Sequence, residues 1–145
     1  MKLSTKGRYG LRAMLDLAIH SQNGHVALYS IAERQGISVN YLEQVFSALR
    51  KAGLVNSVKG AQGGYTLGDK PANLVVGDIL RALEGDLLVV DKSSENENDV
   101  ELCIRANVWD KLNEAINAVV DGITLENLVQ DYQRLSGNLS MMYFI

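Results

Sequence analysis

The sequence contains a single cysteine, Cys103, in 145 residues. One thiol cannot form a disulfide within the chain, and a lone thiol suits a reducing compartment better than an oxidising one. The apolar runs are too short to span a bilayer. Lys2, Lys6, Arg8 and Arg12 interrupt the first 20 residues, where a signal peptide would need an apolar centre. We therefore expect a cytoplasmic protein with no membrane segment.

The sequence also lacks the motifs of enzymes and metal sites. It has no Ser-His-Asp arrangement, no pair of carboxylates with a histidine and no metal-ligand spacing. The glycine-rich residues 59–65, KGAQGGY, do not follow the strand, GxxxxGK[ST] and helix order of a P-loop, and the acidic residues 91–101 lack EF-hand spacing. An enzyme that used Cys103 would need a base near the thiol, and the sequence offers no candidate. We expect no enzymatic activity.

The net charge of −3 is distributed unevenly along the chain. Residues 1–70 contain nine Lys and Arg against four Asp and Glu, a net charge of +5, whereas the remainder contains five against thirteen, a net charge of −8. Binding to phosphates needs only a local basic face. Charge alone leaves nucleic-acid binding and an ordinary solvated surface equally open.

Residues 1–53 predict three helices. Ser4 or Thr5 can cap the first helix, in which apolar residues recur at helical spacing: Leu11, Met14, Leu15 and Ala18. A second helix of about two turns opens at Ser30, and Gly36 can end it in a left-handed conformation. A short helix, a glycine-containing turn and a longer helix have the dimensions of a helix-turn-helix.

The third predicted helix, capped by Ser38 or Asn40, has two distinct faces. At 100° per residue, one narrow stripe is apolar and consists of Leu42, Val45, Phe46 and Leu49. The opposite side is polar and consists of Asn40, Gln44, Ser47 and Lys51, with Glu43 at its margin. Such side chains can contact the edges of bases. Because most amphipathic helices have a polar outer face, this face alone does not separate DNA binding from solvation.

A β-hairpin is predicted directly after this helix. Gly53 ends the helix, strands are expected near residues 54–58 and 64–67, and Lys59 lies at the tip between them. Glycines in the tip permit positive φ and a close approach of the backbone, which a wing lying along DNA requires; they are Gly60, Gly63 and Gly64. The helix-turn-helix and the wing together favour DNA binding over an enzyme site.

Three separated segments resemble the N-terminal domain of the Rrf-two family of bacterial winged-helix transcription regulators: MKLSTKGRYGLRAMLDLA, ISVNYLEQVFSALRKAGLVNSVKG and GGYTLG, with the likeness continuing through VVGDILRALEG. The resemblance implies a mainly α fold with a small β wing, a winged helix-turn-helix domain in residues 1–85 and a homodimeric repressor that binds operator DNA. It implies major-groove contacts from Ser38, Asn40, Tyr41, Glu43 and Gln44, and a basic wing tip at Lys59. Ser47 on the outer helix face is a further candidate, and charge and position add Lys6, Arg8, Arg50 and Lys51, each of which can equally be a solvated surface residue.

The second half predicts an acidic flexible loop in residues 86–101, then a dimerisation helix and a C-terminal docking segment in residues 102–145. Apolar residues line one face of the predicted helix: Ile104, Val108, Leu112, Ala115, Ile116 and Val119. A helix of about 20 residues is ~30 Å long, which is too long for this small domain to cover, so we expect it to pair across a twofold axis. The operator would then be an imperfect palindrome. Packing within the chain, against a helix near Thr124, is the alternative, and the two can coexist. The apolar tail MMYFI is expected to dock on a groove.

Some members of the resembled family hold an iron–sulfur cluster with three cysteines and one further ligand before the long helix. Cys103 matches the last of these cysteines, but the upstream cysteines are absent, and Ala106 stands where a cluster-binding branch has histidine. One thiolate cannot retain such a cluster, so we expect no cofactor. The resemblance is closer to a cluster-free branch, which implies control of cysteine or sulfur metabolism and a cysteine-synthesis enzyme as signalling partner.

Cys103 is interpreted as a small buried side chain, with redox sensing as the alternative. Two alternative functions stay open: an iron–sulfur or redox-responsive regulator that uses Cys103, and a winged-helix adaptor that binds protein.

Overall fold

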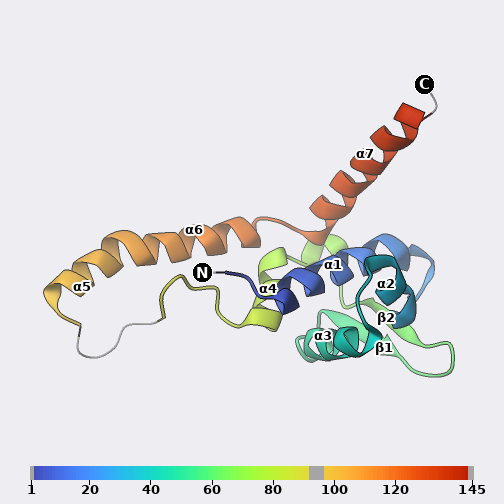
Figure 1. The fold of residues 1–145 in the computed structure, drawn as a ribbon, viewed down its shortest axis with the longest axis horizontal. Helices are drawn as coiled ribbons and strands as arrows, with labels where there is room; N and C mark the ends of the chain where they lie inside the picture. Colours follow the sequence, from blue (N-terminus) through green and yellow to red (C-terminus); the bar gives the residue numbers. More distant parts are fainter. Residues whose placement is uncertain (1, 92–96, 144–145) are drawn as a thin grey trace.

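The computed structural model describes residues 2–91 and 97–143, with the backbone alone for residues 138–143. Within these ranges the chain is mostly helical and has one two-stranded antiparallel sheet. Figure 1 shows these elements, which in chain order are α1 (Thr5–His20), η1 (Ser21–Asn23), α2 (Leu28–Gln35), α3 (Val39–Lys51), β1 (Val55–Val58), β2 (Gly64–Leu67), η2 (Pro71–Asn73), α4 (Val76–Glu84), α5 (Asp99–Ile104), η3 (Arg105–Trp109), α6 (Asp110–Asp121) and α7 (Leu125–Tyr143).

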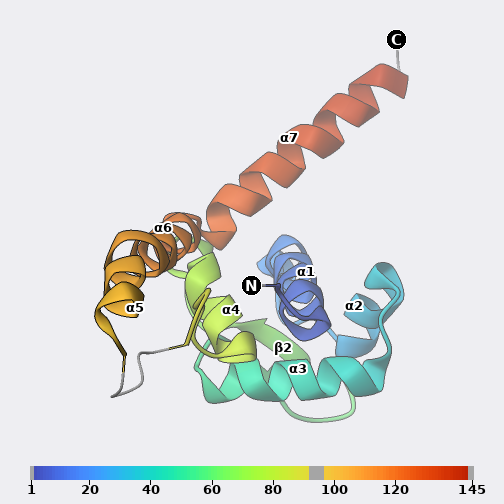
Figure 2. The same cartoon turned by 60° about the vertical axis from the view of Figure 1, so that its left-hand side comes forward.

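The N-terminal part packs four helices around one apolar core. Helix α3 lies across the base, with α1, α2 and α4 above it (Figure 2). The apolar stripe predicted for the third helix is confirmed, because each of its residues is fully buried: Leu42, Val45, Phe46 and Leu49. Met14 and Leu17 from α1, Ile31 from α2 and Ile79 from α4 complete the centre of this core, and all are fully buried. Burial of this stripe leaves the opposite face of α3 exposed.

Local signals fix most helix ends in this part. Ser4 caps α1, and Ser38 caps α3 by accepting a hydrogen bond from the Tyr41 N–H at 3.2 Å. Gly36 ends α2 with φ of 64°, the left-handed conformation expected there. The predicted start of the second helix at Ser30 is wrong by two residues. Helix α2 begins at Leu28 with no side-chain cap, and the carbonyl of Ala27 accepts its first backbone bonds.

The hairpin forms the wing. Strand β1 pairs with β2 in the register Val55↔Leu67 to Val58↔Gly64. Val26 extends this sheet through two backbone bonds of 2.9 Å with Tyr65. Gly60 at the tip has φ of 118°, and a Cβ at Gly64 would collide with the carbonyl oxygen of Val26. Gly60 therefore has the positive φ predicted for the tip, whereas the close backbone approach at Gly64 is to Val26 of the same chain; the predicted approach to DNA stays a prediction.

Helices α5, η3 and α6 form one continuous helix, in which Arg105–Trp109 make a π-helical turn. This helix begins at Asp99, capped by the Asn98 side chain, so the loop predicted for residues 86–101 ends earlier than expected. The start of that loop is also packed rather than free: Leu87 is buried, and the Val89 N–H donates to Asn113 Oδ1 at 2.7 Å. Residues 92–96 of the predicted loop lie outside the described residues.

Helix α7 leaves the winged-helix part and projects away from it (Figure 1). Leu125 at its start is fully buried, and Thr124 pairs with Val75. The long helix packs mainly on α4, and α7 contributes Leu128 beside the cluster of Val76, Leu80 and Leu87. The alternative prediction, that the long helix packs against a helix near Thr124, is therefore met only in part. The side chains of the tail MMYFI lie outside the described residues. No helix in the described ranges is long and apolar enough to cross a membrane.

Candidate nucleic-acid interface

The exposed side of α3 forms a shallow hollow. It is lined by Asn40, Glu43, Gln44 and Ser47. The first three side chains are exposed and Ser47 is half-buried. The structure therefore brings together four of the predicted base-contacting residues on one surface, and amide, carboxylate and hydroxyl groups can all bond to base edges.

A second hollow joins α3 to the wing. Glu43 lines it together with wing residues that include Ser57, Lys59 and Gly60. The wing is held in this position by Tyr65, whose ring lies 4.8 Å from that of Phe46 in α3, measured between centroids. His25 Nε2 contacts the carbonyl oxygen of Gln62 near the tip. Because a carbonyl only accepts, Nε2 carries the proton in this contact.

The side chains of Tyr41 and Ser38 make contacts within the chain. Tyr41 is half-buried, and its ring meets that of Tyr9 edge to face at 6.2 Å between centroids. Tyr41 and Tyr9 line a third hollow together with Thr5 and Ser38. This hollow lies between the start of α1 and the start of α3. The Ser38 oxygen already accepts from the Tyr41 backbone, which leaves its hydroxyl hydrogen available. These two residues shape the surface as well as being able to contact DNA.

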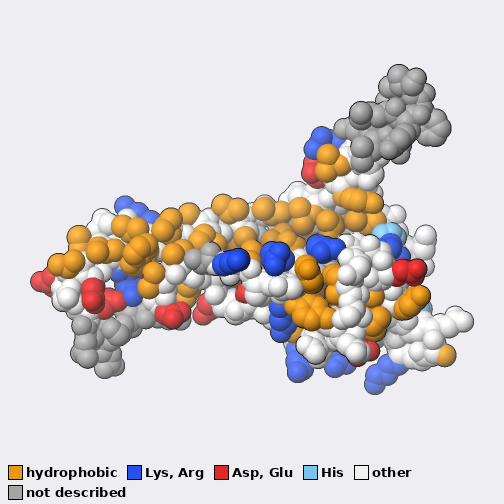
Figure 3. Space-filling view, in the orientation of Figure 1, with side chains coloured by type: hydrophobic (Ala, Val, Ile, Leu, Met, Phe, Trp, Pro, Cys, Tyr) orange, Lys and Arg blue, Asp and Glu red, His pale blue; other side chains and the backbone are white. Residues whose placement is uncertain are grey.

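Basic side chains surround this surface. Lys6 is half-buried, whereas the other four candidates are exposed: Arg8, Arg50, Lys51 and Lys59. Figure 3 shows Lys and Arg gathered along the lower edge of the winged-helix part, below α3. The Arg8 guanidinium lies 5.9 Å from the centre of the Tyr9 ring, which keeps this cation near the start of α1.

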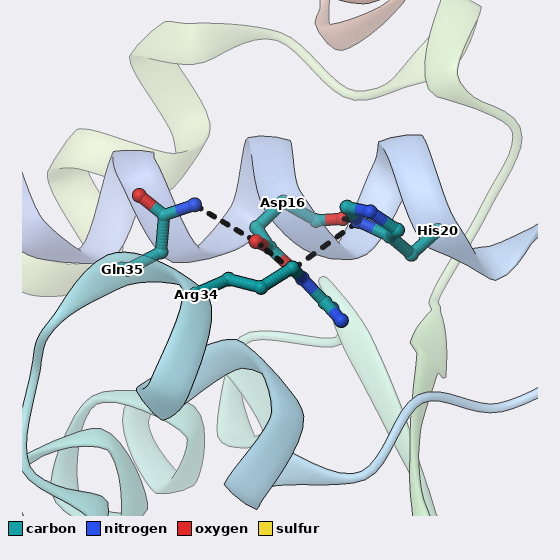
Figure 4. A network of polar contacts seen from close by, with 4 residues as sticks. All are labelled: Asp16, His20, Arg34 and Gln35. Carbon is teal, nitrogen blue, oxygen red and sulfur yellow. Dashed lines mark hydrogen bonds and ion pairs between the residues drawn. The ribbon is translucent and has the colours of Figure 1, made fainter.

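A buried ionic network ties α1 to α2 above the interface (Figure 4). Asp16 is 2% exposed and accepts from Arg34 at 2.7, 3.0 and 3.2 Å and from Gln35 at 2.8 Å. His20 Nδ1 lies 3.4 Å from the same carboxylate. Burial raises the pKa of Asp16. The hydrogen bonds and charge of Arg34, together with the hydrogen bond from Gln35, lower it by more, so the pKa lies below its usual value. The sequence reading missed this network, because its partners are far apart along the chain.

The long helix carries an exposed apolar stripe. Figure 3 shows it as a band along α5 and α6 toward the start of α7. Five of the six predicted dimerisation residues are exposed: Ile104, Val108, Leu112, Ala115 and Val119. Ile116 differs, because it packs within the chain against Val76, Leu80 and Leu87. Val100 and Leu102 in α5 are exposed on the same long helix and were not predicted.

Cys103 is exposed, so the prediction that it is buried within the chain is wrong. The Asn107 side chain contacts its sulfur at 3.8 Å and its carbonyl oxygen at 2.8 Å. Within the described ranges, no three His, Cys, Asp or Glu side chains are grouped to hold a metal ion. One exposed thiol with an amide neighbour does not fit the donor set of an iron–sulfur cluster.

Comparison with known proteins gives consistent matches. The model of the Rrf2 family, described as iron-dependent transcriptional regulators, matches residues 3–131. The chain is 46% identical over 132 residues to the HTH-type transcriptional regulator IscR of Aliivibrio salmonicida, covering 90% of this chain and 79% of the relative. It is 44% identical over 128 residues to the HTH-type transcriptional regulator CymR of Bacillus subtilis, covering 88% and 89%.

Two solved structures extend the similarity to the fold. The structure of CymR, the global cysteine regulator of B. subtilis, matches with a TM-score of 0.76 and 42% identity over 90% of this chain and 97% of that chain. The structure of IscR from T. potens matches with a TM-score of 0.75 and 49% identity over 93% and 90%. The winged-helix fold and the resemblance read from the sequence are confirmed.

Proposed function

The chain belongs to the Rrf2 family and is a DNA-binding transcriptional regulator rather than an enzyme, and on that premise we propose that it is a homodimeric repressor of an imperfect palindrome. One observation supports the DNA-binding part of this proposal. The outer face of α3 and the wing share Glu43 as a common lining residue, so both border one surface. In the proposed complex, α3 enters the major groove and Lys59 at the wing tip contacts the backbone.

The exposed stripe of the long helix supports the homodimer. Leu112 is 43% exposed and Val119 is 62% exposed, and a contiguous apolar band on a soluble protein marks an interaction surface. A second copy of the same stripe is self-complementary across a twofold axis. Two recognition helices related by this axis would read half-sites about one helical turn apart.

The regulated pathway is proposed from the relatives. CymR is described as a global cysteine regulator, and the donor set around Cys103 does not fit a cluster. We therefore favour control of cysteine or sulfur metabolism by a cytoplasmic repressor that has no cluster of its own. The signal would reach it through a protein partner, such as a cysteine-synthesis enzyme.

The experiment compares Gln44→Ala with Lys59→Ala in gel shifts on a selected operator and on unrelated duplex DNA. Gln44→Ala should lower the preference for the operator by about 1–3 kcal/mol, because a side chain bonding to a base edge contributes about that much discrimination. Lys59→Ala should weaken binding to both duplexes and reduce the slope of log affinity against log salt by about 1.

Lys111→Ala is the matched control, because Lys111 is exposed on α6 away from α3 and the wing. It should leave both affinities and the salt slope unchanged. Equal loss of specific and nonspecific binding in the Gln44 and Lys59 variants would contradict the roles assigned to them. Absence of salt-dependent binding to any duplex in the unmodified protein would favour a protein-binding adaptor instead.

A further inference from the structure

Helix α4 lies between the long helix and α1. Two of its charged residues, Arg81 and Glu84, are one turn apart and contact different neighbours: Arg81 contacts α6, and Glu84 contacts the start of α1. Neither contact belongs to the surface proposed to touch DNA. The two residues nevertheless connect the proposed dimer helix with the helix that carries Lys6 and Arg8.

Arg81 holds the inner face of α6. Its Nη2 donates to Asn117 Oδ1 and to Asp121 Oδ2, both at 2.8 Å. Asn117 in turn donates to the carbonyl oxygen of Leu87 at 3.0 Å. The hydrogen bond between Arg81 and Asp121 raises the pKa of Arg81 and lowers that of Asp121, so both groups stay charged at neutral pH. The bonds fix the C-terminal half of α6 against α4.

Glu84 holds the start of α1. Its Oε1 accepts from the backbone N–H groups of Ser4 at 2.9 Å and of Gly7 at 3.0 Å, and from the Ser4 hydroxyl. The first N–H groups of a helix have no partner within the helix, and a carboxylate there is favoured by the helix dipole. Glu84 therefore anchors the end of α1 that flanks the proposed DNA surface.

Three glycines remove the space in which these helices could slide. A Cβ at Gly7 would collide with the Glu84 side chain, and one at Gly10 would collide with Leu83. A Cβ at Gly77 would collide with Asp121 of α6. These contacts show that α4 packs closely against both α1 and α6.

We propose that α4 is a spacer whose positioning residues Arg81 and Glu84 set the separation of the two recognition helices, and therefore the preferred distance between operator half-sites. The inference rests on the proposed homodimer. Because α3 packs on α1 and α4 in the same core, a change in the angle between α4 and α6 moves the recognition helix relative to the twofold axis. Neither residue needs to touch DNA for this effect.

The experiment measures spacing preference directly. The probe is a duplex that the unmodified full-length protein recovers from random-sequence DNA, remade with its half-sites moved apart or together by one and two base pairs. Arg81→Met keeps the length of the side chain but removes the bonds to Asn117 and Asp121. Asp121→Asn is a milder second variant. Arg134→Met is the matched control, because it removes an exposed ion pair with Asp131 on α7.

We expect the unmodified protein and Arg134→Met to prefer one spacing sharply. In Arg81→Met and Asp121→Asn the ratio between the best spacing and its neighbours should fall by about fivefold or more, within the usual range of coupling between two sites. Affinity for an isolated half-site should stay unchanged in all variants. This measurement is a control for folding, because loss of folded protein would lower the affinity for the half-site as well. Thermal melting monitors folding in parallel.

Two results would overturn the inference. The first is a spacing profile in Asp121→Asn and Arg81→Met that equals that of the unmodified protein, which would leave Arg81 a structural residue. The second is a parallel loss of affinity for every spacing and for the half-site. A different failure concerns the proposed function: if the unmodified protein recovers only single half-sites and shows no spacing optimum, the homodimer on a palindrome is wrong.

Discussion

Replacing Arg34 by methionine tests the buried network between α1 and α2. The substitution removes three hydrogen bonds to Asp16, which is 2% exposed, and leaves the bond from Gln35 at 2.8 Å. Removing one partner of a buried ion pair costs about 3–5 kcal/mol. The Arg34 side chain is 35% exposed, so water can reach the site, and we expect the lower end, about 3 kcal/mol. In a chain of this length the melting temperature should fall by about 10 °C.

The same variant has a defined pH dependence. The folded pKa of Asp16 lies below its usual value, so its contribution to stability is fully present above the unfolded pKa of about 3.9 and is lost as the pH falls through the folded pKa. Without Arg34, burial prevails and the pKa of Asp16 rises. The difference in stability between the unmodified protein and Arg34→Met should therefore be largest near neutral pH. It should narrow as the pH falls through the raised pKa of Asp16 in the variant and then through the lowered pKa of Asp16 in the unmodified protein.

Urea unfolding at neutral and acidic pH measures this difference. The double variant Asp16→Asn with Arg34→Met should be more stable than Arg34→Met alone, because it removes the unpaired buried charge. Arg134→Met, which breaks an exposed ion pair, should change stability by only about 0.5 kcal/mol. The reasoning is refuted if Arg34→Met loses less than about 1 kcal/mol, or if the double variant is no more stable than the single one.

Three further substitutions test other parts of the molecule. Leu112→Glu places a charge in the exposed stripe of the long helix, and sedimentation should show half the mass of the unmodified protein; an unchanged mass would remove this stripe from the dimer interface. Gly64→Ala places a Cβ against the carbonyl of Val26, so hydrogen exchange of the Val26 and Tyr65 amides should become faster and DNA affinity should fall. Gly137→Ala is the control, because a Cβ there meets nothing within 4 Å, and it should change neither the exchange nor the affinity. Cys103→Ser and the unmodified protein should bind the operator with the same affinity before and after peroxide, and the anaerobically purified protein should show no cluster absorbance. If peroxide weakens operator binding by the unmodified protein but not by Cys103→Ser, Cys103 is a redox sensor instead.

The features predicted correctly from sequence are those encoded within one or two helical turns. The cap at Ser38, the left-handed Gly36 and the stripe from Leu42 to Leu49 follow from neighbouring residues. The same reasoning explains why the outer face of α3 was recognisable: once the apolar stripe is buried, the polar positions between its members must face outward. The wing was recognisable because its glycines mark the turn between two short strands.

The features that were missed depend on contacts between distant parts of the chain. Glu84 lies 77 residues from Gly7 and Arg81 lies 40 residues from Asp121, and no local pattern relates them. Asp16 is the buried centre of a network, and no neighbouring residue in the sequence marks it as such. Cys103 was expected to be buried as a small apolar residue, but its part of the long helix extends beyond the domain, and the described residues leave the thiol exposed.

One arginine joins the described residues on both sides of positions 92–96 to the long helix. Arg105 in the π-helical turn donates to Glu97 from Nε at 2.8 Å and from Nη2 at 2.6 Å, and its Nη1 donates to the carbonyl oxygen of Asp91 at 3.1 Å. The bonds with Glu97 raise the pKa of Arg105, so the guanidinium stays charged. One side chain thus joins the two residues that border positions 92–96 to the start of the long helix. The protein's own ion pair and hydrogen bond therefore connect the residues before position 92 and after position 96 to the first turns of the long helix.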